Sequence, residues 1–211
     1  MNSIIELLQT FDFGVILQIY QTGGNPLLDF IAVLFSYLGT FRAGAVVLTI
    51  IFALRKETRP LVFVLIVTVL VSSGITGILK EIIERPRPYV ELGLTAADML
   101  VSTRPLGSFP SGHTTTAFAA ATVAAYYFRK WAFPVFLLAC IAGLSRIYLL
   151  VHYPSDVIAG AAVGILSAVL VIYVFERAQE QERRREQERE QEREQEQERR
   201  RARESNEFEE I

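Results

Sequence analysis

The stretch from Leu61 to Leu79 reads LVFVLIVTVLVSSGITGIL and carries no charged side chain. A helix that crosses a bilayer needs roughly 20 consecutive, mostly apolar residues. A helix of a soluble bundle instead keeps a polar face toward water, and this stretch has no such face of sufficient width. We therefore predict a membrane-spanning helix here, in preference to the buried core helix of a soluble protein.

Further apolar stretches extend this prediction to an all-α, polytopic membrane helix bundle. They are Leu27–Leu54, which is broken near Gly39, Thr114–Phe128, Trp131–Leu150 and Ser155–Phe175. Ile4–Tyr20 is also apolar but carries Glu6 and Asp12, so it is either a first span or a helix lying in the membrane interface, and we favour the span. Together these stretches predict about six transmembrane helices.

The charged residues divide the chain into two parts. Residues 176–211 hold 14 of the 23 acidic residues and 10 of the 21 basic ones, with almost no apolar side chain. We therefore predict a membrane domain over residues 1–175 and a solvated Glu/Gln/Arg-rich tail over residues 176–211, helical or disordered. The tail has no apolar seam at heptad spacing, which argues against a coiled coil.

The positive-inside rule predicts the orientation of the spans. The turns Arg55–Arg59 and Arg129-Lys130 hold five bases and one acid, so we expect both turns, both termini and the tail to be cytoplasmic. The segment Arg85–Pro110 and the region of His152 then lie on the outer face of the membrane, which we expect to be the cell membrane. Arg85, Arg87 and Arg104 break the charge rule there, which calls for a functional explanation.

Three polar clusters fall on this predicted outer face, where charged groups near a membrane are costly and usually functional. They are Lys80 with Arg87, Ser111-Gly112-His113, and Ser145-Arg146 with His152 and Asp156. Three converging cations suit a phosphate dianion, which arginine binds bidentately. Ser111 is a good N-cap for a helix whose free amides bind anions, and Gly112 permits close approach of the backbone to an oxyanion.

The two histidines of the chain suggest a division of work. A neutral imidazole can attack phosphorus and form a covalent intermediate, while the leaving oxygen needs a proton. Asp156 follows His152 by four residues, a spacing that lets its carboxylate orient the ring. We therefore interpret His152 as the nucleophile, Asp156 as its orienting partner and His113 as the general acid. Taken singly, each residue is more often an interfacial anchor or part of a turn; the joint pattern favours a site.

These motifs resemble the signatures of the type 2 phosphatidic acid phosphatase (PAP2) superfamily. Lys80-Glu-Ile-Ile-Glu-Arg-Pro-Arg87-Pro88 resembles the first, Pro110-Ser111-Gly112-His113 the second, and Ser145-Arg146 with His152 and Asp156 the third. The resemblance covers about Asn25 to Phe175. Leu150 is a departure, since relatives often have glycine there.

The resemblance implies a six-helix membrane fold and a phosphatase that needs neither a metal nor another cofactor and works through a phosphohistidine. It assigns phosphate binding to a set comprising Lys80, Arg87, Ser111, Gly112 and Arg146. The implied substrates are phosphatidic acid, phosphatidylglycerol phosphate or a polyprenyl diphosphate, and the implied partners are these lipids and the bilayer, without nucleic acid. Two alternatives stay open: a lipid phosphotransferase using the same residues, and a non-enzymatic lipid transporter or scaffold.

Overall fold

The computed structural model describes residues 2–38 and 59–209. The second half of the apolar stretch Leu27–Leu54 and nearly all of the predicted cytoplasmic turn Arg55–Arg59 lie outside these residues. Over the two described ranges the regular elements are all helices, so the predicted all-α class is confirmed.

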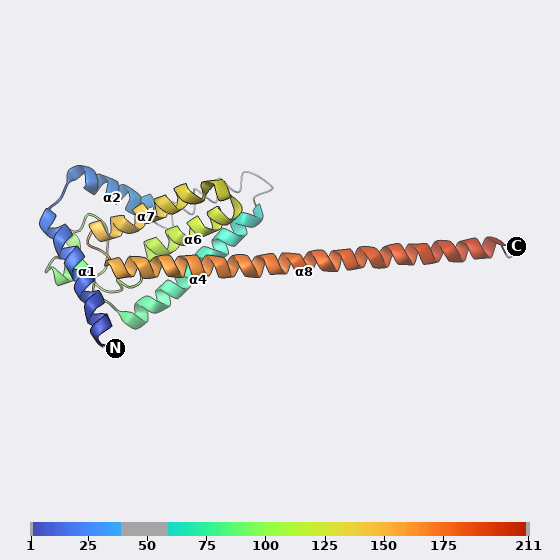
Figure 1. Cartoon of the computed structure of the whole chain (residues 1–211), viewed down its shortest axis with the longest axis horizontal. Helices are drawn as coiled ribbons and strands as arrows, with labels where there is room; N and C mark the ends of the chain where they lie inside the picture. The colour runs from blue at the N-terminus through green and yellow to red at the C-terminus, as the bar shows by residue number, and fades with distance from the viewer. Residues whose placement is uncertain (1, 39–58, 210–211) are drawn as a thin grey trace. The chain divides into compact units, whose positions relative to one another are not determined.

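Seven α-helices and two short 3₁₀ helices make up the described chain (Figure 1). The α-helices are α1 (Asn2–Thr22), α2 (Pro26–Leu38), α4 (Arg59–Ile83), α5 (Pro88–Glu91), α6 (Gly112–Tyr127), α7 (Ala132–Tyr148) and α8 (Pro154–Glu209). The 3₁₀ helices are η2 (Ala96–Asp98) and η3 (Arg129–Trp131).

Three described helical stretches are long and apolar enough to cross a membrane: Leu61–Glu91, Arg129–Tyr148 and Pro154–Arg199. Many of their large apolar side chains face outward; Phe133 is 80% exposed and Ile82 72% exposed. In water such surfaces would be costly, whereas lipid chains accommodate them. The helix expected at Leu61–Leu79 is therefore confirmed as a candidate span, while the number of six spans stays a prediction.

Helix α6 lies at the centre of the bundle, where it packs against α4 and α7, and α2 covers α7. Its buried side chains are alanines, threonines and one valine, and such small residues let the backbones of membrane helices approach closely. Helix α8 comes into close contact with α6 at Gly160 and Gly164. A Cβ atom at Gly164 would lie 2.3 Å from the carbonyl oxygen of Thr115, and one at Gly160 would lie 2.6 Å from that of Ser111.

The ends of these helices follow local sequence signals. Helix α4 stops at Ile83, before two prolines that cannot continue it, and Pro88 then opens α5 with Arg87 as its N-cap. Ser111 caps α6. Pro154 occupies the first position of α8, where its missing N–H costs nothing.

The chain forms two compact units, Met1–Val171 and Ile172–Ile211. The second unit is the continuation of α8, helical to Glu209. Glu180 pairs there with Arg184 at 2.7 Å and with Arg177 at 3.6 Å. Exposed pairs of this kind contribute little to stability, because water and salt screen them.

Candidate active site

The turn between α7 and α8 places His152 beside Arg146. The backbone N–H groups of Val151 and His152 both donate to the carbonyl oxygen of Arg146, each at 3.2 Å. Leu150 adopts φ 56°, and its carbonyl oxygen accepts a hydrogen bond of 3.2 Å from Tyr89 N–H. This turn therefore joins the end of α7 to the segment that carries Arg87.

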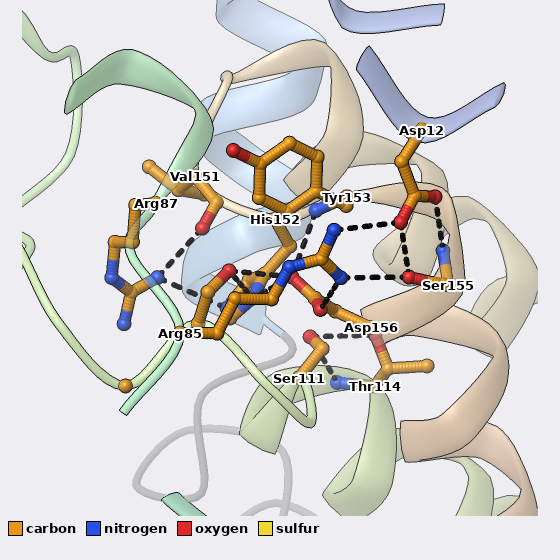
Figure 2. Close-up of polar contacts among 12 residues, drawn as sticks. Asp12, Arg85, Arg87, Ser111, Thr114, Val151, His152, Tyr153, Ser155 and Asp156 are labelled. Carbon is orange, nitrogen blue, oxygen red and sulfur yellow. Dashed lines mark hydrogen bonds and ion pairs between the residues drawn. The ribbon is translucent and has the colours of Figure 1, made fainter. Parts of the chain in front are cut away.

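The two ring nitrogens of His152 face different partners (Figure 2). Nε2 lies 3.2 Å from Nη1 of Arg87, and Nδ1 lies 3.5 Å from Oδ2 of Asp156. Because a guanidinium only donates hydrogen bonds, this arrangement favours the tautomer with its proton on Nδ1, directed at the carboxylate. The Nε2 lone pair then points toward the arginine.

The His152 imidazole is 2% exposed. Burial lowers the pKa of His152 to about 3, and the nearby charges of Arg87 and Arg146 act in the same direction while Asp156 opposes them. The ring is therefore neutral at physiological pH, which is the state that a nitrogen nucleophile requires.

The buried carboxylate of Asp156 is held at both oxygens. Oδ2 accepts hydrogen bonds from Tyr153 N–H at 2.9 Å and from the hydroxyl of Ser108 at 2.5 Å. Oδ1 accepts from Nη1 of Arg85 at 2.8 Å. The Ser108 hydroxyl oxygen also lies 3.5 Å from Nδ1 of His152, so the serine links the imidazole and the carboxylate.

The three predicted phosphate-binding cations come together around the histidines. Arg87 donates from Nη1 to the carbonyl oxygen of Val151 at 2.8 Å, and Arg146 donates from Nη1 to the hydroxyl of Ser36. Lys80 donates from Nζ to the carbonyl oxygens of Gly107 and Ser108. The positive charges of Lys80, Arg87 and Arg146 all lie near enough to the His113 imidazole to interact with it electrostatically.

Two of these cations keep a buried donor that finds no partner among the described residues. The Nε atoms of Arg87 and Arg146 make no hydrogen bond within the described chain. Buried polar groups are almost always paired, so each exception needs an explanation. An anion bound between these arginines would satisfy both.

The N-terminus of α6 is built as the sequence predicted, with one difference. The Ser111 hydroxyl accepts from Thr114 N–H at 3.5 Å and from the Thr114 hydroxyl at 2.9 Å. The Ser111 N–H donates to the backbone carbonyl of Asp156 at 3.0 Å, so it is already engaged. The amides of Gly112 and His113, which belong to the first turn of the helix, are the ones suited to an anion.

Four residues of this region did not appear among the predicted site residues: Asp12, Arg85, Ser108 and Ser155. The Asp12 carboxylate accepts from Nη2 of Arg85 at 2.8 Å and from Ser155 N–H at 3.0 Å. Two of the four carried a signal in the sequence. Asp12 interrupts an apolar helix, and Arg85 is a base on the predicted outer face; no spacing pointed to Ser108 or Ser155.

An all-helical membrane bundle with a buried, carboxylate-linked histidine beside a cluster of cations defines a class of membrane enzymes that act on phosphate groups. The family model described as the PAP2 superfamily matches residues 61–180. The chain belongs to this superfamily, as the three motifs indicated.

Characterised relatives include a lipid A 1-phosphatase of Rhizobium johnstonii, 35% identical over 52% of this chain and 46% of the relative. An undecaprenyl-diphosphatase of Bacillus subtilis is 33% identical over 44% of this chain and 51% of the relative. The chain thus spans about half the length of these relatives. The crystal structure of Aquifex aeolicus LpxE is similar too, with a TM-score of 0.63 and 29% identity over 80% of this chain and 94% of that one.

Proposed function

We propose that this integral membrane protein is a phosphatase that hydrolyses a lipid phosphate or diphosphate through a phosphohistidine at His152. The observation that carries the proposal is the orientation of the His152 ring. One nitrogen faces Asp156 and the other faces Arg87, so a phosphate bound by the arginine would meet the lone pair of Nε2.

The proposed reaction has two steps. The Nε2 lone pair attacks phosphorus and the bond from phosphorus to the leaving oxygen breaks. His113, held protonated by the negative charge of the bound phosphate, gives that oxygen a proton. Asp156 stabilises the positive charge that develops on the ring of His152. His113, now neutral, takes a proton from water as the water attacks the phosphohistidine, which releases inorganic phosphate and restores Nε2.

Phosphate binding falls to Lys80, Arg87 and Arg146, with the amides at the start of α6. The unpaired Nε atoms of Arg87 and Arg146 support this assignment, because a phosphate oxygen accepts strongly from guanidinium groups. The chemistry proceeds without a metal, since the cations and the helix N-terminus supply the positive charge.

The relatives act on a lipid A phosphate and on undecaprenyl diphosphate, and both names describe phosphate on a lipid. We assign this chain a substrate of the same kind. Among the candidate substrates we favour a polyprenyl diphosphate or a phosphatidate-type lipid over phosphatidylglycerol phosphate. The proposed setting is the plasma membrane, with the site on the outer face. Residues 1–175 would form the catalytic domain and residues 176–211 a cytoplasmic tail.

The test is phosphate release by the full-length protein in detergent, with a chelator present, from a panel of these lipids. We expect release of inorganic phosphate by the natural sequence and none by His152→Ala. Gly74→Ala serves as the control because a Cβ atom there meets no neighbour within 4 Å. Loss of activity in chelator would contradict the metal-free mechanism.

The same assay addresses the phosphotransferase alternative. With a lipid labelled in its terminal phosphate, a phosphatase gives labelled inorganic phosphate, whereas a transferase gives a second labelled lipid. An acid-labile, base-stable label on the protein that disappears in His152→Ala would identify the phosphohistidine. Full activity of His152→Ala would disprove the proposed nucleophile.

A further inference from the structure

A charged network lies on the side of Asp156 that faces away from His152. It consists of Asp12 on α1, Arg85 in the segment after α4, and Ser155 at the start of α8 (Figure 2). Arg85 and Ser155 lie within the first and third motif stretches without being among the predicted site residues, Asp12 lies outside all three, and the network ends on a motif carboxylate.

Asp12 is a buried carboxylate, 1% exposed, on a helix whose other side chains are mainly apolar. Its Oδ2 accepts from Nη2 of Arg85 at 2.8 Å and from the Ser155 hydroxyl, and its Oδ1 accepts from Ser155 N–H at 3.0 Å. An unpaired carboxylate at this depth would be very costly. Both oxygens of Asp12 are therefore engaged, and these partners come from the site region.

Arg85 bridges the two carboxylates with separate arms of its guanidinium. Nη2 reaches Asp12, while Nη1 donates to Oδ1 of Asp156 and to the Ser155 hydroxyl, both at 2.8 Å. The guanidinium carbon lies 3.9 Å from the centroid of the Tyr153 ring. Ion pairing and stacking together fix the plane of the guanidinium, which a lysine could not reproduce.

We infer that Arg85 is a positioning residue for the proposed phosphoryl transfer: it holds Asp156 so that Oδ2 faces Nδ1 of His152, and Asp12 holds Arg85 in turn. The inference rests on the proposed function only for its kinetic consequence. A carboxylate can present either oxygen to a neighbour. With Oδ1 occupied by Arg85, the carboxylate keeps Oδ2 toward the imidazole and, together with the Arg87 donor at Nε2, fixes which ring nitrogen carries the proton.

The charges that face His152 come from several elements. Asp156 belongs to α8, Arg87 to the segment before α5 and Arg146 to α7, and Arg85 acts through its contact with Asp156. Replacing Arg85 by glutamine removes one positive charge and frees Oδ1. Tyr153 N–H and the Ser108 hydroxyl still hold Oδ2, so we expect the carboxylate to tilt about Oδ2 and its hydrogen bond with the Nδ1 proton to weaken.

Histidine nitrogen NMR tests this directly, because the chain contains only two histidines and His113→Ala assigns the signals. In the full-length protein in detergent near neutral pH, we expect His152 as a single tautomer with its proton on Nδ1. Arg85→Gln and, to a lesser degree, Asp12→Asn should give averaged nitrogen shifts from two tautomers. An unchanged Nδ1–H tautomer in Arg85→Gln would overturn the inference.

Kinetics on the lipid phosphate give a second readout. Arg85→Gln should lower kcat by about 10- to 100-fold with little change in KM, which is less than the ~10⁴-fold that loss of an orienting carboxylate's function costs. Arg85→Lys keeps the positive charge but lacks the planar guanidinium that bonds to both carboxylates, so it should restore only part of kcat. Asp12→Asn combined with Arg85→Gln should be no worse than Arg85→Gln alone, because the two residues act as one unit.

The matched control is Arg104→Gln, a second arginine of the same outer segment, which is exposed. It should leave both kcat and the His152 signals unchanged. A purely structural role for Arg85 predicts a lower melting temperature with normal kcat per folded molecule and a normal tautomer, which would refute positioning. Failure of the natural sequence to release phosphate would count against the proposed function instead, and the tautomer comparison would still decide the role of Arg85.

Discussion

Leu150 carries a backbone conformation that suits glycine, with φ 56°. A non-glycine residue in the left-handed region costs roughly 1–2 kcal/mol. The leucine side chain offsets part of this cost, because it packs against the buried clusters that contain Leu149 and Tyr153. At the position where relatives often have glycine, Leu150 therefore adds backbone strain and also adds apolar contacts that offset part of it.

These opposing effects predict how substitutions at residue 150 rank in their effect on the free energy of unfolding. Leu150→Gly should change the free energy of unfolding by about 1 kcal/mol or less, since relieved strain and lost burial nearly cancel. Leu150→Val should be more destabilising, because a β-branched side chain is least suited to positive φ. Melting temperatures of the purified variants check this order, and a valine variant as stable as the glycine variant would contradict it.

His152 also predicts how stability depends on pH. The pKa of His152 is lowered to about 3 in the folded protein, whereas an unfolded histidine titrates at about 6.5. Between these values the unfolded chain binds more protons, so stability is greatest above about pH 6.5 and falls as the pH drops toward 3.

The measurement is the fall in melting temperature between about pH 7.5 and about pH 5. The natural sequence should lose more stability over this range than His152→Gln, which lacks the titrating ring. Carboxylates that do not contact His152 contribute to both proteins alike and cancel in the comparison; only Asp156, which lies 3.5 Å from the ring, differs. Equal losses would show that the imidazole is not buried in its neutral form.

Residue types and spacing predicted much of the site and left a definite part out. The motif residues were recognisable because Lys80, Arg87, Arg146 and the two histidines are expensive near a membrane. Ser108 was not, because a serine in a polar segment is unremarkable until the fold brings it to Asp156. Asp12 was visible as an anomaly, yet its partner Arg85 is more than seventy residues away, and no local pattern encodes such a pairing.

At the scale of elements, the contact between α8 and α6 determines the geometry of the site. Ser111 N–H bonds to the carbonyl oxygen of Asp156 beside the point where Gly160 meets the α6 backbone. A side chain at Gly160 or Gly164 would meet backbone atoms, which cannot move aside as a flexible side chain can. The two helices can approach this closely only without those Cβ atoms.

Gly164→Ala should therefore destabilise the protein by about 1–3 kcal/mol, as overpacking does elsewhere, and should lower activity by separating Asp156 from the start of α6. Gly77→Ala is the matched control on α4, because nothing lies within 4 Å of a Cβ atom there. Thermal unfolding and phosphate release measure both effects. A tolerated alanine at residue 164 would mean that α8 packs less closely than described.

Hydropathy located the helices well, with ends that local rules explain. The span expected at Leu61–Leu79 lies within the helix Arg59–Ile83, and the stretch Thr114–Phe128, with Ser111 as the expected N-cap, is found as the helix Gly112–Tyr127. Proline and the N-cap serine fixed those ends. The short helices α5 and η2 escaped notice, because three- and four-residue helices have no periodicity to detect.

At the scale of the whole molecule, the orientation in the membrane remains a prediction that labelling can test. After Cys140→Ala removes the natural thiol, we expect Ala97→Cys, in an exposed segment predicted to lie on the outer face, to react with a membrane-impermeant maleimide on intact cells. Gln187→Cys in the exposed tail should react only after permeabilisation. The positive-inside rule gives this expectation, and the opposite pattern would invert the assigned topology.

The composition of α6 has a consequence for how the protein is made. This helix has 16 residues, begins at the site and buries three threonines, so it is shorter and more polar than a segment that would partition into lipid unaided. We expect its insertion to depend on neighbours already in the bilayer, with α4 and α7 offering the surfaces it packs against. A helix central to the described bundle would then enter the membrane poorly on its own, and biogenesis would proceed by cooperative assembly of helices.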